Sequence, residues 1–173
     1  ALALADLFHL LSRKPHQHPE NRRPSTAAAS VVIPNWNGRH LLATHLPSVV
    51  TAMSANPSNE IIVVDNGSSD GSADLVRERF PTVRLVALDK NLGFGGGSNA
   101  GFRAATNDIV VLLNNDMRVE EDFLQPLLEG FSDEMVFSVS CQIFFSDPAK
   151  VREETGLTQA WWESGSIRVR HRL

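Results

Sequence analysis

Four short apolar runs, separated by stretches with helical periodicity, constrain the fold of this chain more than any other feature. The runs are rich in Val, Ile and Leu and cover residues 31–34, 60–65, 83–88 and 108–113. The helical stretches cover residues 41–53, 72–80, 96–105 and 119–131. Continuous apolar strands are typical of a sheet buried on both faces, and their alternation with helices indicates right-handed crossovers. We therefore predict an α/β fold, a Rossmann-like, mostly parallel sheet with helices on both faces.

Composition narrows the class of protein and its partners. The chain has 173 residues, a net charge of −4 and a single cysteine, Cys141. One thiol cannot form an internal disulfide, and a net negative charge disfavours a general electrostatic grip on nucleic acid. We expect an ordinary globular domain that needs no disulfide and has no nucleic-acid partner.

The composition changes near residue 30, which predicts a boundary between two parts of the chain. Residues 1–12 carry an apolar helical stripe that is shorter than the ~20 residues a membrane span needs. Residues 12–30 are rich in arginine, histidine and proline and lack periodicity. We predict a leading helix and a flexible, basic, proline-rich linker over residues 1–29, and a folded domain over residues 30–173. The linker is interpreted as a solvated tether, with contact to anionic lipid as the alternative.

Polar residues follow each of the four predicted strands. In open parallel sheets the carboxyl ends of the strands meet at one edge, and ligands bind outside that edge. The candidate binding residues there are Pro34, Asn35 and Asn37 at the end of the first strand, Asp65 and Asn66 at the end of the second, Asn91, Gly93, Gly97 and Asn99 after the third, and Asn114, Asn115 and Asp116 after the fourth.

The residue types at this edge suit particular chemistry. The carboxylate of Asp65 can only accept hydrogen bonds, which fits an imide N–H or a ribose hydroxyl, although a structural role is the alternative. The glycine-rich segment before the third helix would let free backbone N–H groups approach a diphosphate. Asp116 with a neighbouring asparagine fits a hard divalent cation that is shared with substrate phosphates. Ser69 or Asp70 is a candidate cap for the second helix.

The glycine-rich segment also permits another interpretation. Gly95, Gly97 and Ala100 satisfy the dinucleotide pattern G-x-G-x-x-A, with Asp116 about twenty residues further on. This predicts an NAD-type oxidoreductase as an alternative function. The pattern normally follows the first strand of its unit, whereas here it follows the third.

Four motifs, in this order, resemble the nucleotide-binding half of a family 2 glycosyltransferase with the GT-A fold. They are VVIPNWNG at residues 31–38, IIVVDNGS at 61–68, NLGFGGGSNAGF at 91–102 and LNND at 113–116. The third motif most resembles that of members that transfer rhamnose or related sugars. The resemblance covers about residues 30–145 and identifies 30–173 as a nucleotide-sugar-binding domain.

The resemblance assigns roles to the strand-end residues. It implies that Pro34, Asn35 and Asn37 line a nucleotide pocket, that Asp65 binds the base or ribose, and that residues 91–101 flank the diphosphate. Asn114, Asn115 and Asp116 take the place of the family's D-x-D motif. This implies Asp116 as a ligand of Mg²⁺ or Mn²⁺, with a metal affinity that depends more on the diphosphate because Asn114 replaces an acid.

The resemblance also implies a reaction and a setting. A sugar would pass, with inversion, from a nucleotide diphosphate sugar to a hydroxyl of a saccharide or lipid-linked acceptor. Relatives of this kind serve cell wall or polysaccharide biosynthesis in the cytoplasm or at the inner face of the membrane, which suggests peripheral membrane contact. A non-catalytic nucleotide-sugar-binding module is the remaining alternative.

The C-terminal part of the sequence provides no assignable catalytic residue. The family's general base is an acidic residue well downstream of the D-x-D position, and Glu153, Glu154 and Glu163 are interpreted as solvated. We therefore expect a domain that is truncated at its C-terminus, with self-association over any exposed sheet edge. Residues 167–173 alternate like a strand. Trp161 and Trp162 are interpreted as the edge of a hydrophobic cluster, with stacking on a sugar as the alternative.

Overall fold

The computed structural model describes residues 27–133, 135–141, 143–144, 147, 157–163 and 165–172. The chain divides into two compact units, of which one is Arg23–Val139 and the other includes Ser140–Leu173. The predicted leading helix lies outside the described residues, as do Glu153, Glu154 and most of the predicted linker.

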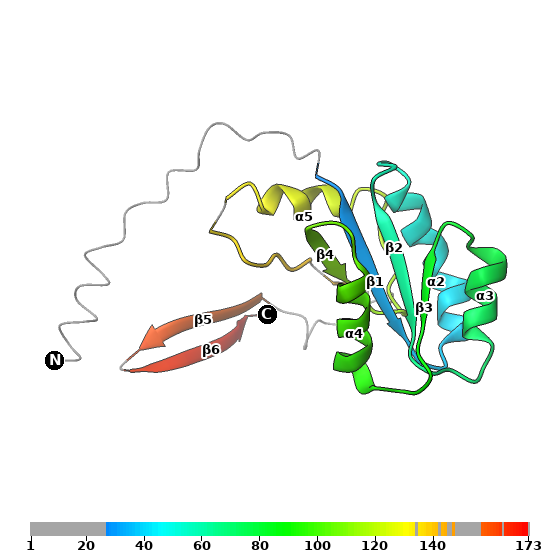
Figure 1. The fold of residues 1–173 in the computed structure, drawn as a ribbon. Coiled ribbons are helices and arrows are strands. Elements are labelled where there is room, and N and C mark those ends of the chain that lie inside the picture. Colours follow the sequence, from blue (N-terminus) through cyan, green and yellow to red (C-terminus); the bar gives the residue numbers. More distant parts are fainter. Residues whose placement is uncertain are drawn as a thin grey trace. The chain divides into compact units, whose positions relative to one another are not determined.

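The unit Arg23–Val139 is built on a four-stranded parallel sheet (Figure 1). Its strands are β1 (Ala29–Asn35), β2 (Glu60–Asp65), β3 (Arg84–Ala87) and β4 (Ile109–Leu112), in the order β3-β2-β1-β4. The chain builds outward from β1 to β3 and then returns to the other side of β1. The order therefore reverses between β1 and β4, where ligands bind in open α/β sheets.

Helices cover both faces of this sheet, which confirms the predicted fold class (Figure 1). They are α2 (Arg39–Met53), α3 (Ser72–Arg79), α4 (Gly93–Ala104) and α5 (Leu124–Gly130). Alternate residues of a strand point to opposite faces. Thus Val31 and Ile33 pack in one core with residues of α2, α3 and α5, whereas Val32 packs in a second core with alanines of α4.

Helix α2 begins at Arg39, two residues before the predicted start, and two other helices depart further from their predicted bounds. Helix α4 begins at Gly93 rather than at residue 96, because Asn91 Oδ1 accepts a hydrogen bond from the Gly93 N–H at 2.7 Å and orders the first turn. Helix α5 covers only Leu124–Gly130 of the predicted 119–131. The Val119 N–H donates to Ser48 Oγ at 3.2 Å, so its backbone is held by α2 before α5 begins.

The sequence predicts Ser69 or Asp70 as the cap of helix α3, and Asp70 does accept hydrogen bonds at its start, although it lies one residue before the cap position. Gly71 occupies the position before the helix, with φ of 80°. The Asp70 carboxylate accepts hydrogen bonds from the Ser72 N–H at 3.0 Å and from the Arg39 N–H at 2.9 Å. Burial by itself would raise the pKa of Asp70, but these bonds and one from the Ser72 hydroxyl lower it below its usual value. Asp70 therefore joins the first turns of α2 and α3.

The other unit contains an antiparallel hairpin of β5 (Leu157–Glu163) and β6 (Ser166–Arg172). Strand β6 confirms that residues near the end of the sequence, where the alternation predicted a strand over 167–173, form one. Trp161 and Trp162 are 43% and 60% exposed, so they are not buried in a hydrophobic cluster. Glu163 is exposed as predicted and pairs with Arg168 at 3.4 Å.

Glu60 joins three segments at the amino edge of the sheet, and this predicts a pH-dependent stability. Its carboxylate accepts hydrogen bonds from Ser30 Oγ at 2.8 Å, from the Thr106 N–H at 3.0 Å and from Arg84 at 3.2 Å. Burial alone would raise the pKa of Glu60, but these bonds lower it below its usual value of 4.5. The folded state therefore favours the ionised carboxylate more than the unfolded chain does. The resulting stabilisation is complete above the unfolded pKa and is lost as the pH falls through the folded pKa.

We expect Glu60→Gln to lower the free energy of unfolding at neutral pH by about 1.5–3 kcal/mol, the value of a hydrogen bond to a charged group. The difference from the unsubstituted protein should shrink as the pH falls below the usual glutamate pKa. Urea unfolding at neutral and acidic pH measures both quantities. Glu78→Gln, on the exposed side of α3, is the control. An equal difference at both pH values would contradict this account.

Candidate functional site

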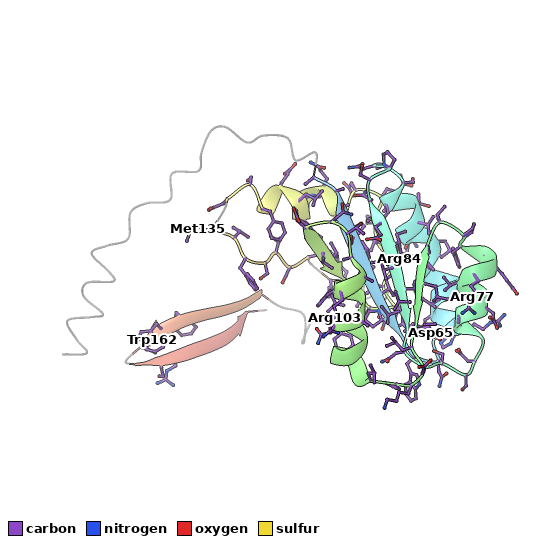
Figure 2. All side chains as sticks on the ribbon, in the orientation of Figure 1. Asp65, Arg77, Arg84, Arg103, Met135 and Trp162 are labelled. Atoms are coloured by element: carbon purple, nitrogen blue, oxygen red, sulfur yellow. The ribbon has the colours of Figure 1, made fainter. Side chains whose placement is uncertain are left out.

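A cleft of about 400 Å³ lies at the carboxyl edge of the parallel sheet. Figure 2 shows Asp65 at this edge, at the end of β2. The cleft is lined by Pro34, Asn35, Trp36, Asn66, Asn91, Gly93, Phe94, Asn114, Asn115 and Asp116. These residues end β1 or come after β1, β2, β3 and β4, so segments far apart in the sequence meet in one place.

Most of the residues predicted from the strand ends line this cleft. Those that line it are Pro34, Asn35, Asn66, Asn91, Gly93, Asn114, Asn115 and Asp116. The remaining four, Asn37, Asp65, Gly97 and Asn99, are not among the lining residues. The contacts of Asn37, Asp65 and Gly97 show what they do instead, whereas Asn99 lies exposed on α4. The binding of a nucleotide by any of the twelve stays a prediction.

Asn35 connects the ends of three strands beneath the cleft. Its side chain is buried, and its Oδ1 accepts a hydrogen bond from Asn115 Nδ2 at 2.8 Å. Its Nδ2 lies 3.5 Å from Asp65 Oδ1 and 3.5 Å from Ser68 Oγ. Asp65 is only 4% exposed, so it orients the Asn35 amide from below. The Asn35 and Asn115 amides therefore lie between the Asp65 carboxylate and the cleft.

Asn66 braces the glycine-rich segment. Its Nδ2 donates to Asn91 Oδ1 at 3.1 Å and to the Gly93 carbonyl at 3.0 Å, and its Oδ1 accepts from the Leu92 N–H at 2.9 Å. Gly97 packs against the same side chain, since a Cβ there would lie 3.1 Å from Asn66 Nδ2. Asn66 and Gly97 thus fix the start of α4 against the end of β2.

The loops after β1 and β2 are tied together by Asn37. Asn37 adopts φ of 49°, an unusual backbone conformation that asparagine tolerates. Its Oδ1 accepts from the Ser69 N–H at 2.9 Å, and its own N–H donates to Ser68 Oγ at 2.9 Å. Gly38 follows directly, and a Cβ at Gly38 would collide with the side chains of Asn35 and Asn115. This loop therefore shapes one wall of the cleft.

Asp116 provides the only carboxylate among the cleft-lining residues. Asn114 and Asp116 are both exposed. The described residues contain no group of three or more His, Cys, Asp or Glu side chains arranged to hold a metal ion. Mg²⁺ is commonly held by one or two carboxylates while water and substrate phosphates fill its remaining positions. The donor set therefore fits a cation that arrives with, and is shared by, a phosphorylated ligand.

Two aromatic residues of the cleft were not assigned from the sequence. Trp36 and Phe94 line it and are 57% and 61% exposed. Large apolar side chains in polar strand-end loops were the available signal, because an exposed ring beside polar groups often marks a binding surface. They give the cleft apolar surface for the planar or apolar part of a ligand.

The profile of glycosyl transferase family 2 matches residues 30–171. The chain belongs to this glycosyltransferase family. A solved mannosyltransferase of Pyrobaculum calidifontis, PcManGT, superposes with a TM-score of 0.60 at 23% identity, covering 78% of this chain and 40% of that one. Its likeness confirms the GT-A fold that the four motifs predicted.

Two curated relatives illustrate the sequence similarity of this family 2 glycosyltransferase to other members. An uncharacterized glycosyltransferase of Nostoc sp. is 34% identical over 113 residues, which cover 64% of this chain and 34% of the relative. The undecaprenyl-phosphate 4-deoxy-4-formamido-L-arabinose transferase of Edwardsiella ictaluri is 36% identical over 106 residues, which cover 58% of this chain and 33% of the relative. The match thus spans about a third of each curated relative.

The family assignment removes the support for an NAD-type oxidoreductase. Gly95 and Gly97 lie inside α4, not in a turn between a strand and a helix. The dinucleotide pattern requires such a turn after the first strand, so its match here is coincidental. Among the residues described, no helix is long and apolar enough to cross a membrane.

Proposed function

We propose that this chain is the donor-binding part of a metal-assisted, inverting glycosyltransferase that acts on a nucleotide diphosphate sugar. The observation that carries the proposal is the cleft at the carboxyl edge of the sheet, where residues from four strand ends meet around one carboxylate. The established family supports sugar transfer, and the GT-A fold supports this edge as the donor site.

In this proposal Asp116, with Asn114, holds Mg²⁺ or Mn²⁺ against the diphosphate. The cation supplies Lewis-acid stabilisation of the leaving diphosphate. PcManGT, the structural neighbour, was solved in complex with GDP-Man and Mn²⁺, which supports a divalent cation here. Helix α4 begins at Gly93, which lines the cleft, so the positive end of the helix favours a negatively charged diphosphate nearby.

The nucleoside would meet the wall formed after β1. In the proposal Pro34 and the Asn35 amide contact the base or ribose, and the buried Asp65 acts through Asn35 by holding that amide in place. Trp36 and Phe94 add ring surface at the mouth. Asn91, Gly93 and Asn99 remain proposed neighbours of the diphosphate.

The proposed acceptor is a hydroxyl of a saccharide or of a lipid-linked molecule, in cell wall or polysaccharide biosynthesis at the cytoplasmic side of a membrane. The name of the Edwardsiella ictaluri relative, which is an undecaprenyl-phosphate sugar transferase, supports the lipid-linked class. None of the described residues is assigned as a general base. A non-catalytic nucleotide-sugar-binding module is accordingly the other outcome to be tested.

Calorimetric titration with UDP, GDP and dTDP, with and without Mn²⁺, tests the donor site. We expect one of these nucleotides to bind, and Mn²⁺ to tighten its binding. Asp116→Ala should weaken binding in Mn²⁺ by at least about tenfold, since a carboxylate paired with a cation is worth more than 1.4 kcal/mol. Asp108→Ala is the control. Asp108 directly precedes β4, at the end of the strand opposite to Asp116, so this substitution removes the same charge and should leave binding unchanged.

The result that overturns the donor site is the absence of heat with every nucleotide in Mn²⁺, or equal affinity for Asp116→Ala and the unsubstituted protein. A second readout separates catalysis from binding. Binding without hydrolysis or transfer of the sugar from any nucleotide sugar favours the non-catalytic module.

A further inference from the structure

Asp116 lies at the tip of a tight turn that follows β4. The turn runs from Asn114 to Met117, and the Met117 N–H donates a hydrogen bond to the Asn114 carbonyl at 3.4 Å. Side chains alternate along this segment. The odd-numbered residues from 113 to 119 are buried or partly buried, whereas the even-numbered ones are exposed. The residues on either side of Asp116 therefore attach the turn to the protein, while the Asp116 carboxylate lies on its open side and lines the cleft.

The chain is anchored to β1 where it enters this turn. The Leu113 N–H donates to the Val32 carbonyl at 3.0 Å, and Asn115 Nδ2 donates to Asn35 Oδ1 at 2.8 Å. Asn35 and Asn115 also line the cleft, so a substitution at either residue alters the cleft directly. The entry to the turn is thus part of the binding surface itself.

The exit from the turn is anchored to α2 by Ser48. The Val119 N–H donates to Ser48 Oγ at 3.2 Å, between residues 71 positions apart in the sequence. A small hollow beneath the turn is lined by Asn114 and Met117 on one side and by His45 of α2 on the other. This hollow leaves the turn room to shift, so its position depends on both anchors. Ser48 itself is not among the residues that line the cleft.

The Ser48 hydroxyl is oriented by its own helix. It donates to the His45 carbonyl at 2.8 Å, just as Thr51 Oγ1 donates to the Pro47 carbonyl at 3.1 Å. Because the hydroxyl proton is used within the helix, the oxygen is left to accept a bond from the Val119 N–H. In the described part of the chain, no residue outside α2 donates to Thr51 Oγ1. Ser48 and Thr51 therefore differ in the bond to the turn.

We infer that Ser48 is a positioning residue for the cation and diphosphate of the donor. It holds the exit of the turn so that Asp116 stays directed into the cleft. The inference rests on the proposed function, in which Asp116 holds the cation. Without the hydroxyl the turn adopts the binding position in only a fraction of the molecules, and the apparent affinity falls by that fraction. Contacts between a nucleoside and the residues after β1 do not involve this anchor.

Calorimetric titration of Ser48→Ala, with whichever of UDP, GDP and dTDP binds the unsubstituted protein, tests the inference. In Mn²⁺ we expect the affinity to fall about fivefold, as the loss of one hydrogen bond of typical net strength predicts. In EDTA the affinity should change less than about twofold, because Asp116 then has no cation to position.

Two further variants are the controls. Thr51→Ala removes the same kind of hydroxyl from an exposed position of the same helix, and it should leave both affinities unchanged. Ser48→Thr restores the hydroxyl, which threonine also directs to the helix backbone, and should keep the affinity in Mn²⁺ within about twofold.

A second readout needs neither metal nor nucleotide. Amide hydrogen exchange at Val119, followed by NMR in the nucleotide-free protein, reports whether its N–H is held. Exchange should be at least about fivefold faster in Ser48→Ala than in the unsubstituted protein, since the N–H loses its acceptor. Thr51→Ala should leave this rate unchanged.

Several results overturn the inference. These are unchanged exchange at Val119 in Ser48→Ala, an equal loss of affinity in Mn²⁺ and in EDTA, or a loss in Ser48→Thr as large as that in Ser48→Ala. If the unsubstituted protein binds no nucleotide in Mn²⁺, the donor site fails and this inference fails with it. If the unsubstituted protein and Ser48→Ala bind equally well in Mn²⁺, the donor site stands and only the role of Ser48 is refuted.

Discussion

Gly101→Ala is expected to lower the free energy of unfolding by about 2 kcal/mol or more, a typical cost of overpacking a core. Gly101 is buried in α4 where the helix lies against the sheet. A Cβ there would collide with Val32 Cγ1 and would lie 3.0 Å from Val64 Cγ2, both of which belong to the packed core. Neither valine can move without displacing β1 or β2, so α4 must lift from the sheet.

Gly95→Ala is the matched control in the same helix. A Cβ at Gly95 has no neighbouring atom within 4 Å. Alanine is favoured over glycine in a helix by roughly 0.5–1 kcal/mol, so this substitution should stabilise the protein slightly. Urea unfolding followed by circular dichroism measures both variants. If Gly101→Ala also stabilised the protein, the close contact between α4 and the sheet would be wrong.

The second large effect is expected at Asn66, on both stability and binding. Asn66→Asp keeps the shape of the side chain. It replaces Nδ2, which donates hydrogen bonds to Asn91 Oδ1 and to the Gly93 carbonyl, by a carboxylate oxygen that faces these two acceptors. A buried charge that faces acceptors without a donor costs more than the 1–3 kcal/mol of an unsatisfied neutral group. We expect a loss of roughly 3 kcal/mol in the free energy of unfolding, because the start of α4 loses its brace.

The same substitution should weaken nucleotide binding by more than about tenfold, because Gly93 and Phe94 in the lining of the cleft are held by this brace. Asn56→Asp is the control, since Asn56 lies in the loop before β2, outside the cleft lining, and its Oδ1 accepts from the Ser58 N–H at 3.0 Å, a bond that an aspartate retains. It introduces the same charge and should change stability by less than about 0.5 kcal/mol. Similar effects of the two substitutions would show that added negative charge, not the loss of the Asn66 brace, governs binding and stability.

The sheet and its binding edge were predictable because the signals for them are local. A run of apolar residues such as 60–65 specifies a strand buried on both faces, whatever packs against it. Polar residues directly after such a run stay near the strand's end, so Asn35, Asn66 and Asn115 were placed correctly at one edge. The start of α4 was missed because Asn66 and Asn91, which order its first turn, act across a loop between separate strands.

The sequence by itself determined the order of strands and helices, the α/β class, the family, and the strand ends from which the site is built. Only the tertiary structure decided which of those residues face the cleft. The register sets Asn35 beside Asp65, and the Asn115 amide then closes over Asn35, so the carboxylate is covered. The end of a strand can be predicted from the point at which one run of apolar residues stops. Whether its side chain meets a ligand depends on hydrogen bonds to partners as many as 80 residues away.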